Sequence, residues 1–315
     1  MAMEATAEHL SPRRYRVVHQ TSYDYDEPVT TCYERGFLAP RETPSQTVVE
    51  SALRISPEPA FVAEHRDYFG NLSHYVEVPT DHHHLEITKD FVVDVAWPAA
   101  SIASLNQWSV AQARSLIQDD AGQRVQAQLY RLRSPKVQPS DAVVDYARDV
   151  IGDDRMHGDD RGLGDVFSDL TLGIYRDFAY RPGVTTTRTT LAELMELRAG
   201  VCQDFAHLAV GCLRLFGLPA RYVSGYIETT PPPGKPKLAG SDASHAWASV
   251  LTPDGSWVDV DPTNAHFADS RYVVNGWGRD FGDVSPLKGV ISTEATSSSL
   301  KVGVDVIRVE TSNLS

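Results

Sequence analysis

The stretch RAGVCQDFAHLAVGCLRLFGLPARYVSGY, residues 198–226, contains two of the three cysteines in this chain of 315 residues. Cys202 begins a pattern typical of a helix. Apolar residues recur on one side of that helix at spacings of four, three and four: Phe205, Ala209, Cys212 and Phe216. Gly217 and Pro219 predict its end, because glycine is common just after a last turn and proline cannot continue a helix. Cys202 therefore lies in the first turn, whereas Cys212 lies on the apolar side of the helix.

Cys202 admits two interpretations. A free cysteine is among the most buried residue types, so a small buried side chain at a helix start is one of them. The other is a nucleophile, because the unpaired N–H groups at a helix N-terminus favour the thiolate form of cysteine. We expect Gly200 to let the chain turn sharply into the helix. A nucleophile would also need a histidine within reach, itself oriented by a carboxylate.

The run SHAWASVLTPDGSWVDVDPTN, residues 244–264, offers such a pair. Its Pro-Asp-Gly sequence at 253–255 predicts a turn between two alternating strands, and therefore a β-hairpin. A three-residue loop sets Trp247 opposite Asp261. His245 and Asp261 then share one face of the hairpin as diagonal neighbours, within side-chain reach of each other. A loop of two or four residues would also keep them near one another, in a shifted register.

The rest of the chain predicts an α+β fold. Residues 12–99 contain alternating stretches separated by prolines and turn sequences, which predict an antiparallel β-rich domain. Residues 100–162 change to helix-forming patterns and predict a helical connecting segment. Residues 163–315 predict helices followed by antiparallel strands, including a C-terminal strand. Helices that precede a run of antiparallel strands indicate α+β rather than alternating βαβ units.

Composition argues against several classes of protein. The net charge of −13, from 42 acidic and 29 basic residues, argues against nucleic acid and anionic membranes as partners and favours basic or neutral peptides. We find no signal peptide and no apolar run long enough to span a membrane. Three cysteines form a poor disulfide framework and fit a reducing compartment. We therefore expect a cytoplasmic protein.

Four motifs, GVCQDFAH, ARYVSGY, SHAWASV and WVDVDPTN, resemble in their order and spacing the transglutaminase-like core of papain-type thiol enzymes. The run that starts at YRPGVTTTRTT and leads into the first of them resembles the bacterial branch of that family. HQTSYDY, the Pro-Arg pair at 40–41 and DYFGN resemble the β-rich domain that precedes the core in that branch, and GRDFGDVSPLKGV resembles its post-core loop. The resemblance implies a papain-like core, with helices packed on an antiparallel sheet, preceded by an antiparallel β-rich domain.

The resemblance also implies a Cys-His-Asp triad. Cys202 would be the nucleophile, His245 the general base and acid, and Asp261 the residue that orients His245. The backbone N–H of Cys202 would be one oxyanion donor. Further residues are candidates for binding substrate or supporting the site: Gln203, Asp204, His207, Tyr180, Trp247 and Arg279. A hydrogen-bonded core histidine is an equal alternative for His207. The resemblance implies no metal and no organic cofactor.

The implied chemistry is acyl transfer to and from the thiol of Cys202 through a thioester. We favour hydrolysis of an amide, peptide or isopeptide bond in a peptide or protein substrate, because water needs no dedicated binding site whereas an acceptor amine does. Two alternatives stay open. One is a protein-glutamine amine transferase that cross-links proteins, which would differ in how it excludes water from the acyl-enzyme. The other is a non-catalytic module that binds peptides on the same fold.

Overall fold

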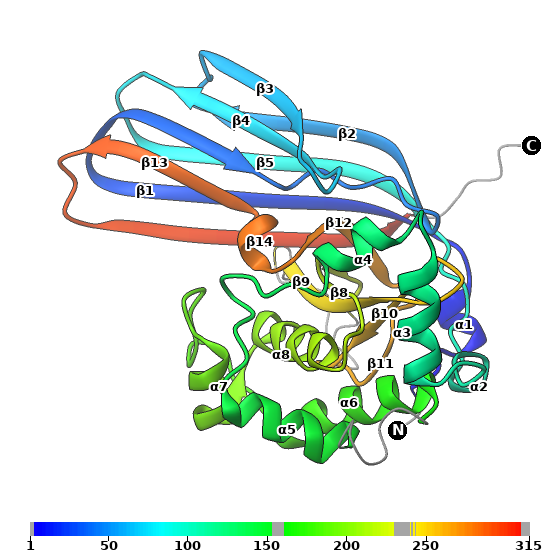
Figure 1. Ribbon diagram of the computed structural model, residues 1–315. Coiled ribbons are helices and arrows are strands. Elements are labelled where there is room, and N and C mark those ends of the chain that lie inside the picture. Colours follow the sequence, from blue (N-terminus) through cyan, green and yellow to red (C-terminus); the bar gives the residue numbers. More distant parts are fainter. Residues whose placement is uncertain (1–2, 153–160, 230–239, 241, 243, 310–315) are drawn as a thin grey trace, which may run out of the picture.

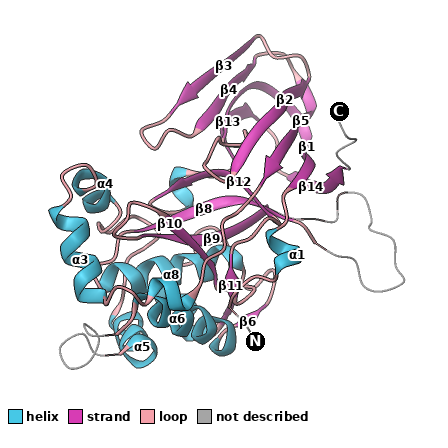
Figure 2. Cartoon of the chain, turned by 90° about the vertical axis from the view of Figure 1, so that its right-hand side faces the viewer, coloured by secondary structure: helices cyan, strands magenta, loops and turns pink. Residues whose placement is uncertain are grey.

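Two antiparallel sheets and a group of helices are stacked as three layers in the computed structural model of the protein (Figure 1). The structure describes residues 3–152, 161–229, 240, 242 and 244–309. A seven-stranded sheet forms one outer layer, a five-stranded sheet lies in the middle, and helices cover the other face of the smaller sheet (Figure 2). This is the α+β architecture that the sequence predicts, with a β-rich part before the helices.

The seven-stranded sheet is built around β1, which spans 24 residues. The first half of β1 pairs with β5 and β14, and its second half pairs with β4 and β13. The strands of this sheet are β1 (Arg13–Gly36), β2 (Gln46–Ser56), β3 (Phe61–Arg66), β4 (Leu72–Val78), β5 (His82–Val95), β13 (Leu287–Thr293) and β14 (Ser298–Val309). Its inner face packs on the smaller sheet through an apolar cluster that includes Tyr15 and Phe91 from one sheet and Tyr226 and Val273 from the other.

The last two strands differ from the predicted domain organisation. The sequence predicts residues 163–315 as one core with its own C-terminal strand, whereas β13 and β14 pair with β1 in the large sheet. The reason is that alternation specifies a strand and its buried face but not the strand beside it. Residues 100–162 are also more than a connector, because Val110 and Val143 belong to the same apolar cluster as the helices that follow.

The five-stranded sheet has the order β11-β10-β9-β8-β12. Its strands are β8 (Ala220–Ile227), β9 (Ser244–Leu251), β10 (Trp257–Asp261), β11 (His266–Phe267) and β12 (Tyr272–Gly278). The β9–β10 hairpin has the register of the predicted three-residue loop, with Trp257 paired to Leu251 and Val260 paired to Ala248. That pairing ends at Val260, so Asp261 lies one residue beyond it.

The helices lie mainly on the face of the small sheet that points away from the large one (Figure 1). They are α1 (Ala7–Leu10), α2 (Ile102–Leu105), α3 (Val110–Asp119), α4 (Arg124–Leu129), α5 (Asp141–Ile151), α6 (Leu163–Asp177), α7 (Leu191–Leu197), α8 (Cys202–Leu215) and the 3₁₀ turn η2 (Phe281–Asp283). Two short strands, β6 (Ala179–Tyr180) and β7 (Ala199–Gly200), pair in parallel just before α8. None of the described helices is long and apolar enough to cross a membrane.

Candidate active site

The N-terminus of α8 is organised by a buried carboxylate. Cys202 is the first helical residue, and its side chain is partly exposed. Asp204 accepts hydrogen bonds from the backbone N–H of Val201 at 2.9 Å and from the hydroxyl of Thr185 at 2.7 Å. Burial raises the pKa of Asp204, while these two hydrogen bonds oppose the rise. Asp204 thus fixes the helix start and ties the segment around Thr185 to it.

Gly200 has a different role from the predicted one. Arg198, rather than Gly200, takes the left-handed conformation at the turn, with a φ of 48°. A Cβ atom at position 200 would lie 2.7 Å from Oδ2 of Asp204. The lack of a side chain therefore makes room for the carboxylate that holds the start of α8.

His245 and Asp261 form a buried pair at one end of the small sheet. His245 is the second residue of β9 and Asp261 is the last residue of β10. Nε2 of His245 lies 2.6 Å from Oδ2 of Asp261, and the two residues are 7% and 0% exposed. The diagonal placement on a shared face therefore brings the two side chains into direct contact.

Asp261 receives three further partners. The hydroxyl of Tyr272 donates to Oδ2 at 2.6 Å, the side-chain amide of Asn264 donates to Oδ2 at 2.7 Å, and the N–H of Thr263 donates to Oδ1 at 2.8 Å. Burial alone would raise the pKa of Asp261, but the charge of His245 and these side-chain hydrogen bonds hold that pKa well below its usual range. The carboxylate is therefore kept ionised in a site without solvent contact.

The imidazole of His245 lies between Asp261 and Cys202. The thiol of Cys202 is within hydrogen-bonding reach of the ring. Since Nε2 faces Asp261, Nδ1 is the ring nitrogen left for the sulfur. Burial by itself would lower the pKa of His245, but Asp261 and then Cys202 raise that pKa to about 10. The arrangement favours a positively charged imidazole beside the thiol, as a thiolate–imidazolium pair requires.

Trp247 and Tyr180, the two aromatic candidates from the sequence, lie at different places around His245 and Cys202. Trp247 is fully buried, with its ring stacked near His245 at a centroid distance of 6.0 Å and its indole N–H donating to Asp259 at 2.7 Å. It packs against the histidine ring and is not open to substrate. Tyr180 is 54% exposed, and its pKa is raised by burial and by the neighbouring Cys202 and Asp261. Tyr180 therefore lies on the open side of the site.

The remaining predicted residues are spread around α8. His207 is buried and accepts the backbone N–H of Phe281 at 3.1 Å, and burial lowers its pKa to about 3, as suits a neutral acceptor. The guanidinium of Arg279 is held by Asp283, with Nε 3.0 Å from Oδ2. Gln203 lies in the first turn of α8 and is partly exposed.

Among the residues that the structure describes, no group of three or more His, Cys, Asp or Glu side chains could hold a metal ion.

Tyr272 and Asn264 were not identified from the sequence. Asn264 closes the DPTN motif three residues after Asp261, so a polar side chain directly beyond the strand was the available signal. Tyr272 carries no such local signal, because it enters from the edge strand β12, which β9 and β8 separate from β10 in the sheet.

Comparisons with known proteins identify the family of this chain. Residues 15–94 match the model of the bacterial transglutaminase-like N-terminal region, and residues 155–262 match that of the transglutaminase-like superfamily. The uncharacterized protein Rv2569c of Mycobacterium tuberculosis (strain ATCC 25618 / H37Rv) is 43% identical over 305 residues, which cover 94% of this chain and 93% of that protein. This chain belongs to the transglutaminase-like superfamily. The superfamily match includes Cys202, His245 and Asp261.

Two other similarities are to a solved structure and to a named enzyme. A solved structure of a Cytophaga hutchinsonii protein, named as a candidate cysteine protease, superposes with a TM-score of 0.73 over 96% of this chain and 92% of that chain, at 18% identity. At that identity the similarity establishes a shared fold. A protein-glutamine gamma-glutamyltransferase of Pseudomonas aeruginosa is 34% identical over 92 residues, which are 28% of this chain and 14% of that protein.

Proposed function

We propose that this protein is a cysteine-dependent acyl-transfer enzyme that hydrolyses an amide, peptide or isopeptide bond in a peptide or protein substrate. The observation that carries the proposal is the buried His245–Asp261 pair, 2.6 Å between nitrogen and oxygen, with the partly exposed Cys202 near enough to the imidazole to raise its pKa. A nucleophile, a base and a group that orients the base are the three parts that thiol catalysis needs.

In the first half of the reaction the sulfur of Cys202 attacks the carbonyl carbon of the amide, and a carbon–sulfur bond forms. The carbonyl oxygen takes up the negative charge and is stabilised by the backbone N–H of Cys202, which the first turn of a helix leaves without an intrahelical acceptor. His245 gives its proton to the leaving nitrogen, the carbon–nitrogen bond breaks, and the amine departs. Tyr180, on the open side of the site, is a second donor candidate for the oxyanion.

In the second half a water molecule attacks the thioester. His245, now neutral, takes a proton from that water while oxygen bonds to the carbonyl carbon. The carbon–sulfur bond then breaks, which releases the carboxylic acid and returns the sulfur and the charged imidazole to their starting states. Asp261 stays ionised throughout and keeps the ring oriented.

Amine transfer is the alternative that one comparison favours. A relative that matches 28% of this chain is a protein-glutamine gamma-glutamyltransferase, in whose reaction an amine takes the place of the water. The two activities differ only in the group that attacks the thioester. A fluorescent primary amine, supplied with a glutamine-containing protein such as casein, separates them: incorporation of the amine indicates transfer, whereas release of free acid without incorporation indicates hydrolysis.

We also retain a cytoplasmic location as part of the proposal. The support for it is chemical: Cys32, Cys202 and Cys212 are all free thiols in the structure.

The experiment that tests the enzyme proposal compares Cys202→Ala with Cys212→Ala. Release of amine from a library of peptidyl-coumarin amides is measured for each variant and for the wild type. We expect Cys202→Ala to abolish release while its circular dichroism spectrum stays that of the wild type, and Cys212→Ala to keep activity. Turnover that persists in Cys202→Ala would contradict the proposal, and so would a library on which the wild type releases nothing above a no-enzyme blank.

A further inference from the structure

A cavity of about 460 Å³ lies between the large sheet and the part of the chain that carries the Cys-His-Asp residues. The large sheet contributes the inner face of β1 and β14 and the start of β13, and the segments 187–188 and 281–286 complete the lining. Apolar and cationic side chains are prominent in its lining. The apolar wall includes Tyr23, Leu300 and Val302, and three cations contribute to the lining: Lys136, Arg188 and Lys288.

The cavity lies near the candidate active site, although none of Cys202, His245 and Asp261 lines it. Ser244 lines it and directly precedes His245 in β9. Phe281 lines it too, and packs with Cys202 against the same small apolar cluster, which includes Tyr222. The cavity is therefore close enough to Cys202 to receive the part of a substrate chain that flanks the reacting amide.

The wall formed by β14 exposes apolar surface toward the cavity. Alternate residues of β14 face inward, and Val304 and Val306 are 0% and 1% exposed where the small sheet covers them. The same row continues as Val302 and Leu300, which are 51% and 58% exposed. Apolar side chains on an inward face that stay open next to a reactive site are suited to contact with an apolar side chain of a ligand.

The charge of the cavity is opposite to that of the whole protein. The chain has a net charge of −13, yet the described lining contains three cationic side chains and no Asp or Glu. The ammonium of Lys136 donates to the backbone carbonyl of Thr187 at 2.5 Å. Arg188 and Lys288 form no ion pair with the described part of the chain. Their charge is therefore available to a carboxylate that enters from outside.

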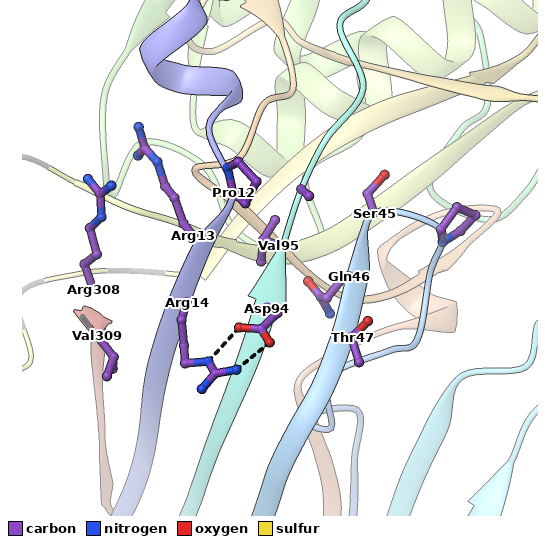
Figure 3. Close-up of a pocket in the computed structure, with 12 residues that line it drawn as sticks. Pro12, Arg13, Arg14, Ser45, Gln46, Thr47, Asp94, Val95, Arg308 and Val309 are labelled. Carbon is purple, nitrogen blue, oxygen red and sulfur yellow. Dashed lines mark hydrogen bonds and ion pairs between the residues drawn. The ribbon is translucent and has the colours of Figure 1, made fainter. Parts of the chain in front are cut away.

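A larger cavity, of about 980 Å³, does not share these features (Figure 3). It lies where the ends of β1, β2, β5 and β14 meet, and no described residue of α8, β9 or β10 lines it. Its arginines are already neutralised in part: Arg14 forms a two-point pair with Asp94 at 2.6 Å, and Arg13 is paired with Glu228. Size alone therefore does not identify the space that receives substrate.

We propose that the smaller cavity binds the stretch of substrate next to the reacting amide and selects peptides in which an acidic residue lies beside an apolar one. The apolar side chain packs on Leu300 and Val302, and the carboxylate is held by Arg188 and Lys288. This inference rests on the proposed function, because it places the reacting amide at Cys202. The net charge of the chain led us to expect basic or neutral peptides as substrates. The local charge of the cavity instead favours acidic ones.

The test uses three thiol-reactive probes whose second residue is acidic, neutral or basic: N-iodoacetyl-Leu-Glu-amide, N-iodoacetyl-Leu-Gln-amide and N-iodoacetyl-Leu-Lys-amide. The rate of alkylation of Cys202 by each is measured by peptide mass spectrometry and divided by the rate with plain iodoacetamide on the same variant. Arg188→Gln and Lys288→Gln each remove one cavity charge. Lys301→Gln removes one charge from the same strand as Leu300 and Val302, but its ammonium is paired with Asp24 outside the cavity, which makes it the matched control.

We expect the Glu probe to react with the wild type about three- to tenfold faster than the Lys probe, since each exposed charge pair is worth a few-fold in binding. The ratio should fall in Arg188→Gln and in Lys288→Gln and stay unchanged in Lys301→Gln. Equal rates for the three probes, or a ratio that Lys301→Gln lowers as much as the cavity variants do, would overturn the cavity assignment while leaving the proposed function intact. If plain iodoacetamide fails to alkylate Cys202 in the wild type, both proposals are wrong.

Discussion

At the scale of residues, the pair of His245 and Asp261 links stability to pH. The pKa of His245 is raised to about 10, from an ordinary value of about 6.5, so the pair contributes its full stability below about pH 6.5 and loses it as the pH rises through about 10. The pKa of Asp261 is lowered, so its contribution is present above about pH 4 and is lost as the pH falls through the lowered value. The pair is therefore most stabilising between about pH 4 and about pH 6.5.

Asp261→Asn tests this linkage. The substitution leaves a buried imidazole without its counter-charge, so the pKa of His245 should fall below its ordinary value and the free energy of unfolding at pH 6.5 should fall by about 3–5 kcal/mol. The difference in the free energy of unfolding between the variant and the wild type should become smaller as the pH approaches 10. Urea unfolding at a series of pH values measures this difference. Asp94→Asn, which breaks an exposed pair with Arg14, should lower the free energy of unfolding by less than about 1 kcal/mol. A constant difference between Asp261→Asn and the wild type from pH 6.5 to 10 would refute the linkage.

At the scale of elements, the β9–β10 hairpin and α8 were predictable because their signals are local. A Pro-Asp-Gly turn between two alternating strands predicts the hairpin, and the structure has the register of the three-residue loop, which brings His245 to Asp261. The position of Cys202 follows in the same way from the apolar spacing of α8. Tyr272 could not be found by this route, because its contact with Asp261 depends on which strands are neighbours in the sheet.

Gly200→Ala tests the account of how α8 begins. The new Cβ atom would lie 2.7 Å from the Asp204 carboxylate, which must then move away from the N–H of Val201. We expect the free energy of unfolding to fall by about 1–3 kcal/mol and amide turnover to fall with it, because the first turn of the helix shifts. Gly303→Ala is the control, since its Cβ would have a nearest contact of 3.6 Å. Equal stability of the two variants in urea would show that Gly200 is not needed for close packing.

At the scale of the whole molecule, the N-terminal motifs join the two sheets. Arg41, from the Pro-Arg pair, stacks its guanidinium 3.6 Å from the ring centroid of Trp277 and donates to Asn71 at 2.8 Å. Asn71, from the DYFGN motif, also donates to the carbonyl of Trp277 at 2.8 Å. Trp277 lies on β12, the strand that provides Tyr272 to Asp261. These motifs therefore hold the large sheet against the strand that supports the candidate active site.

The pairing of the last two strands with the first one explains why the domain boundaries were predicted less well than the elements. The chain starts the large sheet with β1, builds the helices and the small sheet, and then returns to β1 with β13 and β14. Local patterns report each strand but not this return, because the partner of β14 lies about 280 residues away in sequence. The return also forms the wall of the cavity proposed to bind substrate.

The central claim is that His245 activates the thiol of Cys202. A simple comparison among cysteines does not test it, because Cys32 and Cys212 are 1% and 0% exposed and would react slowly for that reason alone. The direct measurement is the rate of alkylation of Cys202 by iodoacetamide at pH 6.5 in the wild type and in His245→Gln, whose side-chain amide can still donate to Asp261. We predict that the rate falls about a hundredfold in the variant, the size of effect that a positioned acid–base partner commonly has. An unchanged rate in a folded His245→Gln protein would contradict the claim.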